Sequence, residues 1–304
     1  MSIHDQGRPL LSIAVPIYNH ADRFQRQLES LRTFAENKAE VEFVVVDDAS
    51  TDELQPVLNL FRAAGWLLRS SRQTANRGRA PALAKAIRNS RGRFVMIMDG
   101  DDTFCDQGLD HAIAVLRQRG DSCAGFVFST QIEDSTGYLR VNSVPEGLRC
   151  TLLALRADHH ISGDLKEVVR RDILIAALCP LFDSFRRVPT SLLWARVSDE
   201  IEVKCIATPL VRKVYLPGGM TKSLGTLRKS SVQPLIATYA HLASSTAYRS
   251  FRYRWRALIN YHRFLVWPHK RQSHVKPVWL GIPALIGLCY GVFEIALARV
   301  RKPK

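Results

Sequence analysis

The sequence predicts an α/β protein built on a mostly parallel, doubly wound sheet, and two observations predict it. Short apolar runs alternate with helical patterns four times within about the first hundred residues, which is typical of parallel strands joined by crossover helices. The run Phe94 to Met98 is apolar without polar alternation, as expected of a parallel strand covered on both faces. Ligands bind at the carboxyl ends of the strands in such a sheet, so the residues that follow each strand become the candidates for a site.

The predicted elements follow from these runs and from the residues that bound them. Strands are expected at residues 10–15, 41–46, 66–69 and 94–98, and helices at 21–34, 53–64, 81–89 and 106–119. Pro16 is expected to end the first strand, and the Ser, Thr and Asp residues before Glu53 to cap the second helix. Pro81 suits the first turn of the third helix, where its missing N–H is tolerated. A strand at 124–132 is expected to continue the sheet, and 203–207 with 210–216 to close it as a hairpin.

The fourth strand ends abruptly in three carboxylates, Asp99, Asp101 and Asp102. Gly100 between them allows the chain to turn sharply where it leaves the sheet. Closely spaced Asp side chains repel one another unless a cation lies between them, and hard oxygen ligands favour Mg2+ or Mn2+ shared with a phosphate. The plainer alternative is a solvated Asp-Gly turn that caps the next helix.

Two more polar turns are expected at the same edge of the sheet. Asp47 or Asp48 can accept hydrogen bonds from a base or ribose, while Arg77, Arg79 and Lys85 can face phosphates. Together with Asp99 and Asp101 on a divalent ion, these turns indicate a nucleotide diphosphate. The sequence contains neither a G-x-x-x-x-G-K-[ST] loop nor a G-x-G-x-x-G after the first strand, which argues against an ordinary nucleotidase or dinucleotide enzyme.

The composition gives the net charge of the chain and indicates the compartment in which it works. The chain has 304 residues, a formal net charge of +15, and six cysteines without a C-x-x-C pair. Scattered cysteines of this kind are expected to be reduced and mostly buried, as in a cytosolic protein. The first residues carry no apolar signal segment, so residence on the cytosolic side is expected.

Four motifs in register resemble the family-2 inverting glycosyltransferases with the glycosyltransferase-A fold: Val15-Pro-Ile-Tyr-Asn19, Val46-Asp-Asp-Ala-Ser-Thr-Asp52, Asn76-Arg-Gly-Arg79 and Met98-Asp-Gly-Asp-Asp102. The resemblance implies a nucleotide-diphosphate sugar donor, a Mg2+ or Mn2+ ion, and transfer with inversion at the anomeric carbon. It also implies site residues by position. Pro16 and Tyr18 would line the base pocket, Asp48 would bind the base, Asp99 would contact the ribose or metal, and Asp101 would be the metal ligand.

The resemblance leaves the catalytic base open. Inverting transfer needs a group that takes the proton of the acceptor hydroxyl, and a carboxylate usually serves. The family tends to place a Glu-Asp pair after a Phe-Asp, but Phe182-Asp183 is followed here by no acidic pair. Asp164 and Asp183 are the candidates, with a helix cap or a surface turn as the alternative for each. His159 and His160 could act near neutral pH. The Q-x-x-R-W signature of processive synthases does not occur, which favours a single addition.

The basic charge gathers near the end of the chain. Residues 248–267 interleave arginines with aromatic side chains, and 278–298 follow as 21 residues with one charge, Glu294. Arginine and aromatic residues beside an apolar segment fit a lipid headgroup layer better than nucleic acid. The apolar segment is expected to attach to the membrane as an interfacial, re-entrant or spanning element, or else to pack as a helix on the catalytic domain.

These inferences give a domain plan and a function. A catalytic domain is expected at 1–225, with a nucleotide-sugar half at 8–105 and an acceptor half at 106–225, followed by a membrane-associating region at 226–304. Residues 218–222 are expected to form a loop that closes over the donor or is a plain connection. The predicted function is non-processive transfer of a sugar to a lipid-linked or cell-surface glycan during envelope polysaccharide synthesis. The alternatives are an inactive donor-binding scaffold and another sugar-nucleotide enzyme, such as a nucleotidyltransferase.

Overall fold

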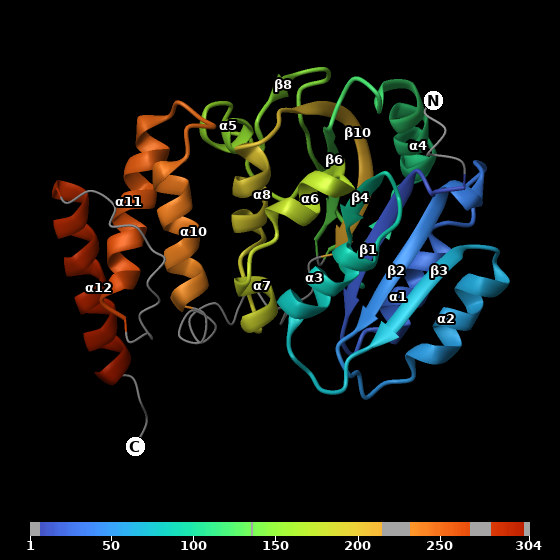
Figure 1. The fold of residues 1–304 in the computed structure, drawn as a ribbon, viewed down its shortest axis with the longest axis horizontal. Coiled ribbons are helices and arrows are strands. Elements are labelled where there is room, and N and C mark those ends of the chain that lie inside the picture. Colours follow the sequence, from blue (N-terminus) through green and yellow to red (C-terminus); the bar gives the residue numbers. More distant parts are fainter. Residues whose placement is uncertain (1–6, 135, 215–231, 268–280, 301–304) are drawn as a thin grey trace. The chain divides into compact units, whose positions relative to one another are not determined.

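The computed structural model describes residues 7–134, 136–214, 232–267 and 281–300, and it divides into two compact units (Figure 1). Unit 1 comprises Met1–Cys150, Ile161–Arg186 and Ile201–Pro217, and unit 2 comprises Thr151–His160, Arg187–Glu200 and Gly218–Lys304. The proposed boundary after residue 225 stays a prediction, and the loop expected at 218–222 lies outside the described residues.

Unit 1 is built on one sheet with the strand order β3-β2-β1-β4-β9-β6-β10-β5. Strands β3, β2, β1 and β4 are mutually parallel, while β9 runs antiparallel to both β4 and β6. The strands are β1 (Leu11–Ile17), β2 (Val41–Asp47), β3 (Leu67–Arg72), β4 (Phe94–Ile97), β5 (Thr103–Phe104), β6 (Gly125–Glu133), β7 (Leu139–Asn142), β8 (Arg149–Cys150), β9 (Lys166–Arg170) and β10 (Val203–Val214). The predicted doubly wound, mostly parallel sheet is therefore confirmed.

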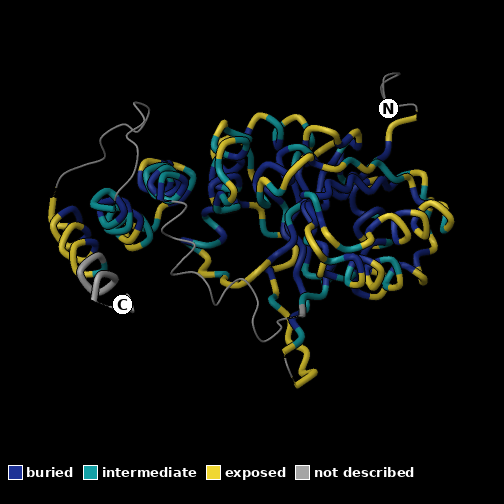
Figure 2. Tube along the Cα trace, turned by 90° about the horizontal axis from the view of Figure 1, so that it is seen from below, coloured by how far each residue is buried: buried dark blue, intermediate teal, exposed yellow. Residues whose placement is uncertain are grey.

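Helices cover both faces of this sheet. They are α1 (Ala21–Glu29), α2 (Leu54–Ala63), α3 (Arg79–Asn89), α4 (Gly108–Arg119), α6 (Arg171–Ala177) and α7 (Leu181–Ser184). One face of β1 and β2 packs with Phe24 of α1 and Phe61 of α2 in a large core, where the two rings stack at 4.5 Å. The other face carries the alanine-rich helix α3, whose small side chains allow close approach to the strands. Figure 2 shows the central strands of this unit as buried.

Three local predictions are wrong for physical reasons. Residues 203–214 form one strand rather than a hairpin, because the chain absorbs Pro209 as an irregularity in its pairing with β6 instead of turning back. Strand β1 continues through Pro16 to Ile17, where it still pairs with Asp47. Asp52 does not cap α2, because its carboxylate accepts a hydrogen bond from the backbone N–H of Ala21 at the start of α1.

Unit 2 is helical. Its helices are α5 (Leu152–Ala157), α8 (Thr190–Ser198), α10 (Val232–Ser244), α11 (Phe251–Leu265) and α12 (Ile282–Val300). Helices α11 and α12 meet closely, since Gly287 and Gly291 lie against the backbone of Ile259 and Arg263. Within the described residues, no helix combines the length and the apolarity that crossing a membrane requires.

The six cysteines are free, as predicted, and four of them, Cys105, Cys123, Cys150 and Cys205, are buried. Burial raises the pKa of the Cys105 thiol to about 11, so this thiol stays protonated at neutral pH.

Candidate functional site

The acidic turn after β4 is held in place by a buried glutamine. The side chain of Gln27, on α1, donates hydrogen bonds to the carbonyl oxygens of Asp99 at 3.3 Å and Asp102 at 2.9 Å. The turn is closed by a backbone hydrogen bond from Asp102 to Asp99. This clamp fixes the backbone and leaves the carboxylates of Asp99 and Asp101 partly exposed, with 37% and 40% of their side chains accessible.

Cations of the chain surround this turn. The guanidinium group of Arg79, in the first turn of α3, donates two hydrogen bonds to one oxygen of Asp99 at 2.9 and 2.6 Å. Burial raises the pKa of Asp99, but the positive charges of Arg79, Lys213 and Lys166 outweigh it and hold that pKa well below its ordinary value. Asp99 is therefore a carboxylate at any pH at which the protein would work. Among the described residues, the Asp101 carboxylate pairs only with Arg23, at 3.4 Å.

Two lysines lie beneath the turn. The ammonium groups of Lys166 on β9 and Lys213 on β10 are both 3.3 Å from the same oxygen of Asp102, and the side chains of Asp102 and Lys166 are each 6% exposed. Lys166 also donates a hydrogen bond to the carbonyl oxygen of Ile97. Burial raises the pKa of Asp102, and the two lysines oppose that change. The group joins β4, β9 and β10 at the edge where the acidic turn begins.

Replacing Asp102 by Asn is expected to lower the free energy of unfolding by about 3 kcal/mol, because it removes the paired carboxylate of the buried Lys166 and leaves Lys213 with Asp164 alone. Urea denaturation measures this. The exposed Asp106, replaced by Asn, is the matched control and should change stability by less than about 0.5 kcal/mol. Adding Lys166→Met to Asp102→Asn should restore part of the loss; equal stability of Asp102→Asn and wild type would contradict this account.

Asp48 organises the loop before α3. Its carboxylate accepts hydrogen bonds from the backbone N–H groups of Arg77 and Gly78, both at 2.7 Å, and from the Gln73 side chain at 2.9 Å. Gly78 has φ +96 and its α-carbon lies against the backbone of Arg186, so neither the conformation nor the space admits a side chain. Asp48, which was predicted to bind the base, therefore fixes the loop at Arg77 and Gly78, which was predicted to contact phosphates.

The carboxylates present fit a hard divalent cation. Among the described residues, no group of three or more His, Cys, Asp and Glu side chains could hold a metal ion alone. Mg2+ and Mn2+ sites of nucleotide enzymes use one or two carboxylates and take their other ligands from water and substrate phosphates. The second oxygen of Asp99 and the carboxylate of Asp101 supply such a pair, because Arg79 occupies only one oxygen of Asp99.

The two candidate bases, Asp164 and Asp183, have different surroundings in the structure. Asp164 follows Gly163, which has φ +82 as the predicted tight turn requires, and its carboxylate lies 3.5 Å from Lys213 with 51% of the side chain exposed. Lys213 therefore links Asp164 to Asp102 of the acidic turn. Asp183 instead forms a two-point ion pair with Arg88, and the hydrogen bonds from Arg88 lower the pKa of Asp183 below its ordinary value.

The remaining predicted residues are placed as follows. Pro16 is buried within β1, Tyr18 follows that strand with 41% of its surface exposed, and Arg77 donates to the carbonyl oxygen of Asp183. Lys85 is half-buried in the middle of α3 and has no hydrogen-bond partner among the described residues, so nothing ties it to the acidic turn. The roles assigned to these residues stay predictions.

Sequence reasoning missed Gln27, Lys166 and Lys213. Gln27 lies among apolar neighbours of α1 and is fully buried, and a polar residue at a core position is a signal that could have been followed. The two lysines gave no such signal, because β9 was not predicted and β10 was predicted as a hairpin.

A family model described as glycosyl transferase family 2 matches residues 12–174. The protein named teichuronic acid biosynthesis glycosyltransferase TuaG, from Bacillus subtilis (strain 168), is 26% identical over 141 residues, which are 46% of this chain and 55% of that protein. The chain spans about half or less of the length of the first curated relatives it matches.

Two solved structures have a similar fold. One is Staphylococcus aureus TarS 1-349 in complex with UDP-GlcNAc, with TM-score 0.58 and 19% identity over 84% of this chain and 71% of that chain. The other is the mannosyltransferase PcManGT of Pyrobaculum calidifontis in complex with GDP-Man and Mn2+, with TM-score 0.55 and 19% identity over 98% of this chain and 77% of that chain. These likenesses confirm the α/β, glycosyltransferase-A-like fold class.

Proposed function

Because the chain belongs to glycosyl transferase family 2, we propose that it moves a sugar from a nucleotide-diphosphate sugar onto a lipid-linked or cell-surface glycan, with inversion and a single addition. The observation that carries the proposal is the acidic turn at the carboxyl end of β4, where two partly exposed carboxylates lie beside Arg79 and Lys213. TuaG is named for teichuronic acid biosynthesis, and the titles of the two solved structures carry UDP-GlcNAc and GDP-Man, which supports this class of donor and acceptor.

The chain's own residues divide the work as follows. Asp101 and the second oxygen of Asp99 would hold a Mg2+ or Mn2+ ion, and that ion would supply positive charge to the departing diphosphate. The guanidinium group of Arg79 and the ammonium group of Lys213 add fixed positive charge on the same side. Asp48 shapes the loop at Arg77 and Gly78 against which the nucleotide lies. Asp164 takes the proton from the acceptor hydroxyl, since Lys213 keeps it near the acidic turn.

Transfer is tested by incubating the full chain with radiolabelled UDP-, GDP- and dTDP-sugars and Mn2+ in the presence of envelope lipid and glycan extracts. The expected result is label in the acceptor fraction with release of nucleoside diphosphate, both lost on addition of EDTA. Consumption of a nucleoside triphosphate with release of pyrophosphate would instead make the protein a nucleotidyltransferase. Donor binding with no transfer to any fraction would favour the scaffold alternative.

We propose that unit 2 contacts an anionic membrane surface. Helix α12 exposes a stripe of large apolar side chains along one side: Ile282, Leu285, Ile286, Leu288, Tyr290, Val292 and Phe293. Its opposite side, with Gly287 and Gly291, packs on α11, and Glu294 is paired with Arg263 of that helix. An apolar stripe of this kind suits the boundary between headgroups and acyl chains.

Exposed arginines of α11 complement the stripe. Arg252 and Arg256 lie on the side of α11 that also carries Ile259 and Arg263, the residues that contact α12. Arg254 is unsuitable as a probe, because it donates to the carbonyl oxygens of Ser245 and Tyr248 and stacks on the Tyr248 ring.

Replacing both Arg252 and Arg256 by Ala is expected to weaken binding to anionic vesicles by about thirtyfold, at about 1 kcal/mol for each basic residue near the surface. Vesicle sedimentation at low and high salt measures this, and salt should weaken the wild-type binding too. The matched control replaces Arg8 and Arg32, two exposed arginines of unit 1, and should sediment as wild type does. Equal sedimentation of both double variants would contradict the proposed surface.

A further inference from the structure

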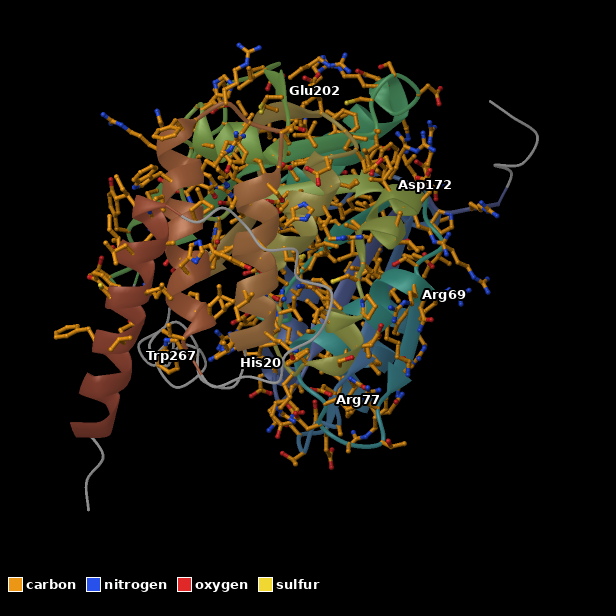
Figure 3. The ribbon with its side chains drawn as sticks, turned by 60° about the vertical axis from the view of Figure 1, so that its left-hand side comes forward. His20, Arg69, Arg77, Asp172, Glu202 and Trp267 are labelled. Atoms are coloured by element: carbon orange, nitrogen blue, oxygen red, sulfur yellow. The ribbon has the colours of Figure 1, made fainter. Side chains whose placement is uncertain are left out.

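A basic cavity lies in unit 1 at the end of α3 that is remote from the acidic turn. It has a volume of about 380 Å³ and is lined by four arginines together with serines of β3 and the end of α3: Arg69, Arg88, Arg91, Arg171, Ser70, Ser71 and Ser90. Helix α3 has 11 residues, so its two ends are about 16 Å apart at 1.5 Å per residue. Figure 3 shows Arg69 and Arg77 at clearly separate places on this unit.

The charge in this cavity is only partly neutralised. Arg69 pairs with the buried carboxylate of Glu42 at 3.2 Å, and Arg88 pairs with Asp183 at 2.6 Å. Among the described residues, no carboxylate pairs with the side chain of Arg91 or of Arg171. The positive charges of Arg91 and Arg171 are therefore not neutralised by a paired carboxylate, and they would attract a ligand of negative charge.

A buried hydroxyl adds a hydrogen-bond donor. Ser71 lines the cavity, and its hydroxyl oxygen is buried and has no hydrogen-bond partner among the described residues. Because a buried polar atom without a partner is costly, this hydroxyl favours a ligand atom that would accept its hydrogen bond.

The carboxyl end of α3, which lines the cavity, does not prevent the binding of an anion. The carboxyl end of a helix carries partial negative charge, which by itself would repel one. Arg171 offsets this, since its guanidinium group donates to the carbonyl oxygens of Ser90 at 2.5 Å and Arg88 at 3.4 Å. The end of α3 thus becomes part of a positively charged wall.

We propose that this cavity binds a phosphate monoester of a small polyol or sugar, with the phosphate on Arg91 and Arg171 and the Ser71 hydroxyl donating to it. Arginine forks match the geometry of phosphate oxygens, and the volume is at the lower end of that of small-molecule sites. The site differs from the donor site and needs neither a nucleotide nor a metal ion.

Calorimetric titration with glycerophosphate in EDTA tests this site, with neutral glycerol as the second probe. Glycerophosphate should bind and glycerol should not. Arg91→Gln should weaken the binding about tenfold and Ser71→Ala by a few-fold, because each removes one donor to the phosphate. The matched control is Arg32→Gln, which removes an exposed arginine outside the cavity and should bind as wild type does. Neither Arg91 nor Ser71 supports another side chain among the described residues, so both variants should fold, as thermal melts will check.

Hydrogen–deuterium exchange locates the ligand. Glycerophosphate should protect residues 67–72 and 88–92 and leave 76–80 and 99–104 unchanged. Protection confined to 76–80 and 99–104, equal weakening by Arg91→Gln and Arg32→Gln, or no binding by wild type would each overturn the proposal. Because EDTA and the absence of a nucleotide silence the donor site, these outcomes do not depend on whether sugar transfer occurs.

Discussion

An Asp101→Asn variant is expected to lose sugar transfer by about a thousandfold in kcat/KM, because it removes a charged ligand from the cation that offsets the developing charge of the diphosphate. The carboxylate is 40% exposed and, in the part of the chain that the structure describes, its one ion pair is a long contact with Arg23, so its loss should hardly change stability. Turnover of a radiolabelled donor over a range of Mn2+ concentrations measures the effect. Part of the loss should be recovered at high Mn2+, since Asp99 remains.

The control for this variant is Asp106→Asn, which makes the same chemical change at an exposed position after the acidic turn. Its kcat/KM should stay close to that of wild type. If Asp101→Asn kept full turnover at low Mn2+, the acidic turn would not be the metal site, and the solvated-turn alternative would hold.

An Asp164→Asn variant is expected to lower kcat by about a hundredfold or more while leaving donor affinity nearly unchanged, because a general base acts on the acceptor and not on the donor. Single-turnover rates at saturating donor, together with direct donor binding, separate the two quantities. The prediction follows from position: Lys213 contacts both Asp164 and Asp102, which places Asp164 beside the acidic turn.

Asp183→Asn is the comparison for Asp164. Its carboxylate is tied to Arg88 by two hydrogen bonds, which lower its pKa and make it a weaker base than an unpaired carboxylate. Loss of this half-exposed ion pair should cost less than about 1 kcal/mol of stability. A large fall in kcat for Asp183→Asn, with Asp164→Asn near wild type, would show that Asp183 and not Asp164 is the general base.

The fold was predictable where the sequence pattern is local. The first, second and fourth strands are largely apolar and end in turn residues, so the order and the parallel direction of the first four strands followed from their alternation with helices. Strands β9 and β10 were harder. The Lys166–Arg170 segment has charged residues at both ends and only two apolar residues, so its sequence does not indicate a strand. Pro209 suggests a chain reversal in the sequence, but in the structure it is an irregularity in the pairing of β10 with β6. Pairing partners far away in sequence decide such segments.

The site was predictable in its carboxylates and not in their partners. Asp99, Asp101 and Asp102 stand out because three acids follow a buried strand. The residues that set their electrostatics, Arg79, Lys166 and Lys213, come from α3, β9 and β10, and only the folded sheet brings them together. Likewise, Asp183 looks like a candidate base in sequence, and its pairing with Arg88 becomes visible only when α7 lies beside α3.

Calorimetric titration of UDP-, GDP- and dTDP-sugars into wild type and Asp101→Asn, with and without Mn2+, tests the central claim most directly. The account predicts that at least one donor binds wild type in the presence of Mn2+, and that its affinity falls strongly when Mn2+ is withheld or Asp101 is replaced. Binding of no donor under any of these conditions, or binding that neither Mn2+ nor Asp101 affects, would contradict it.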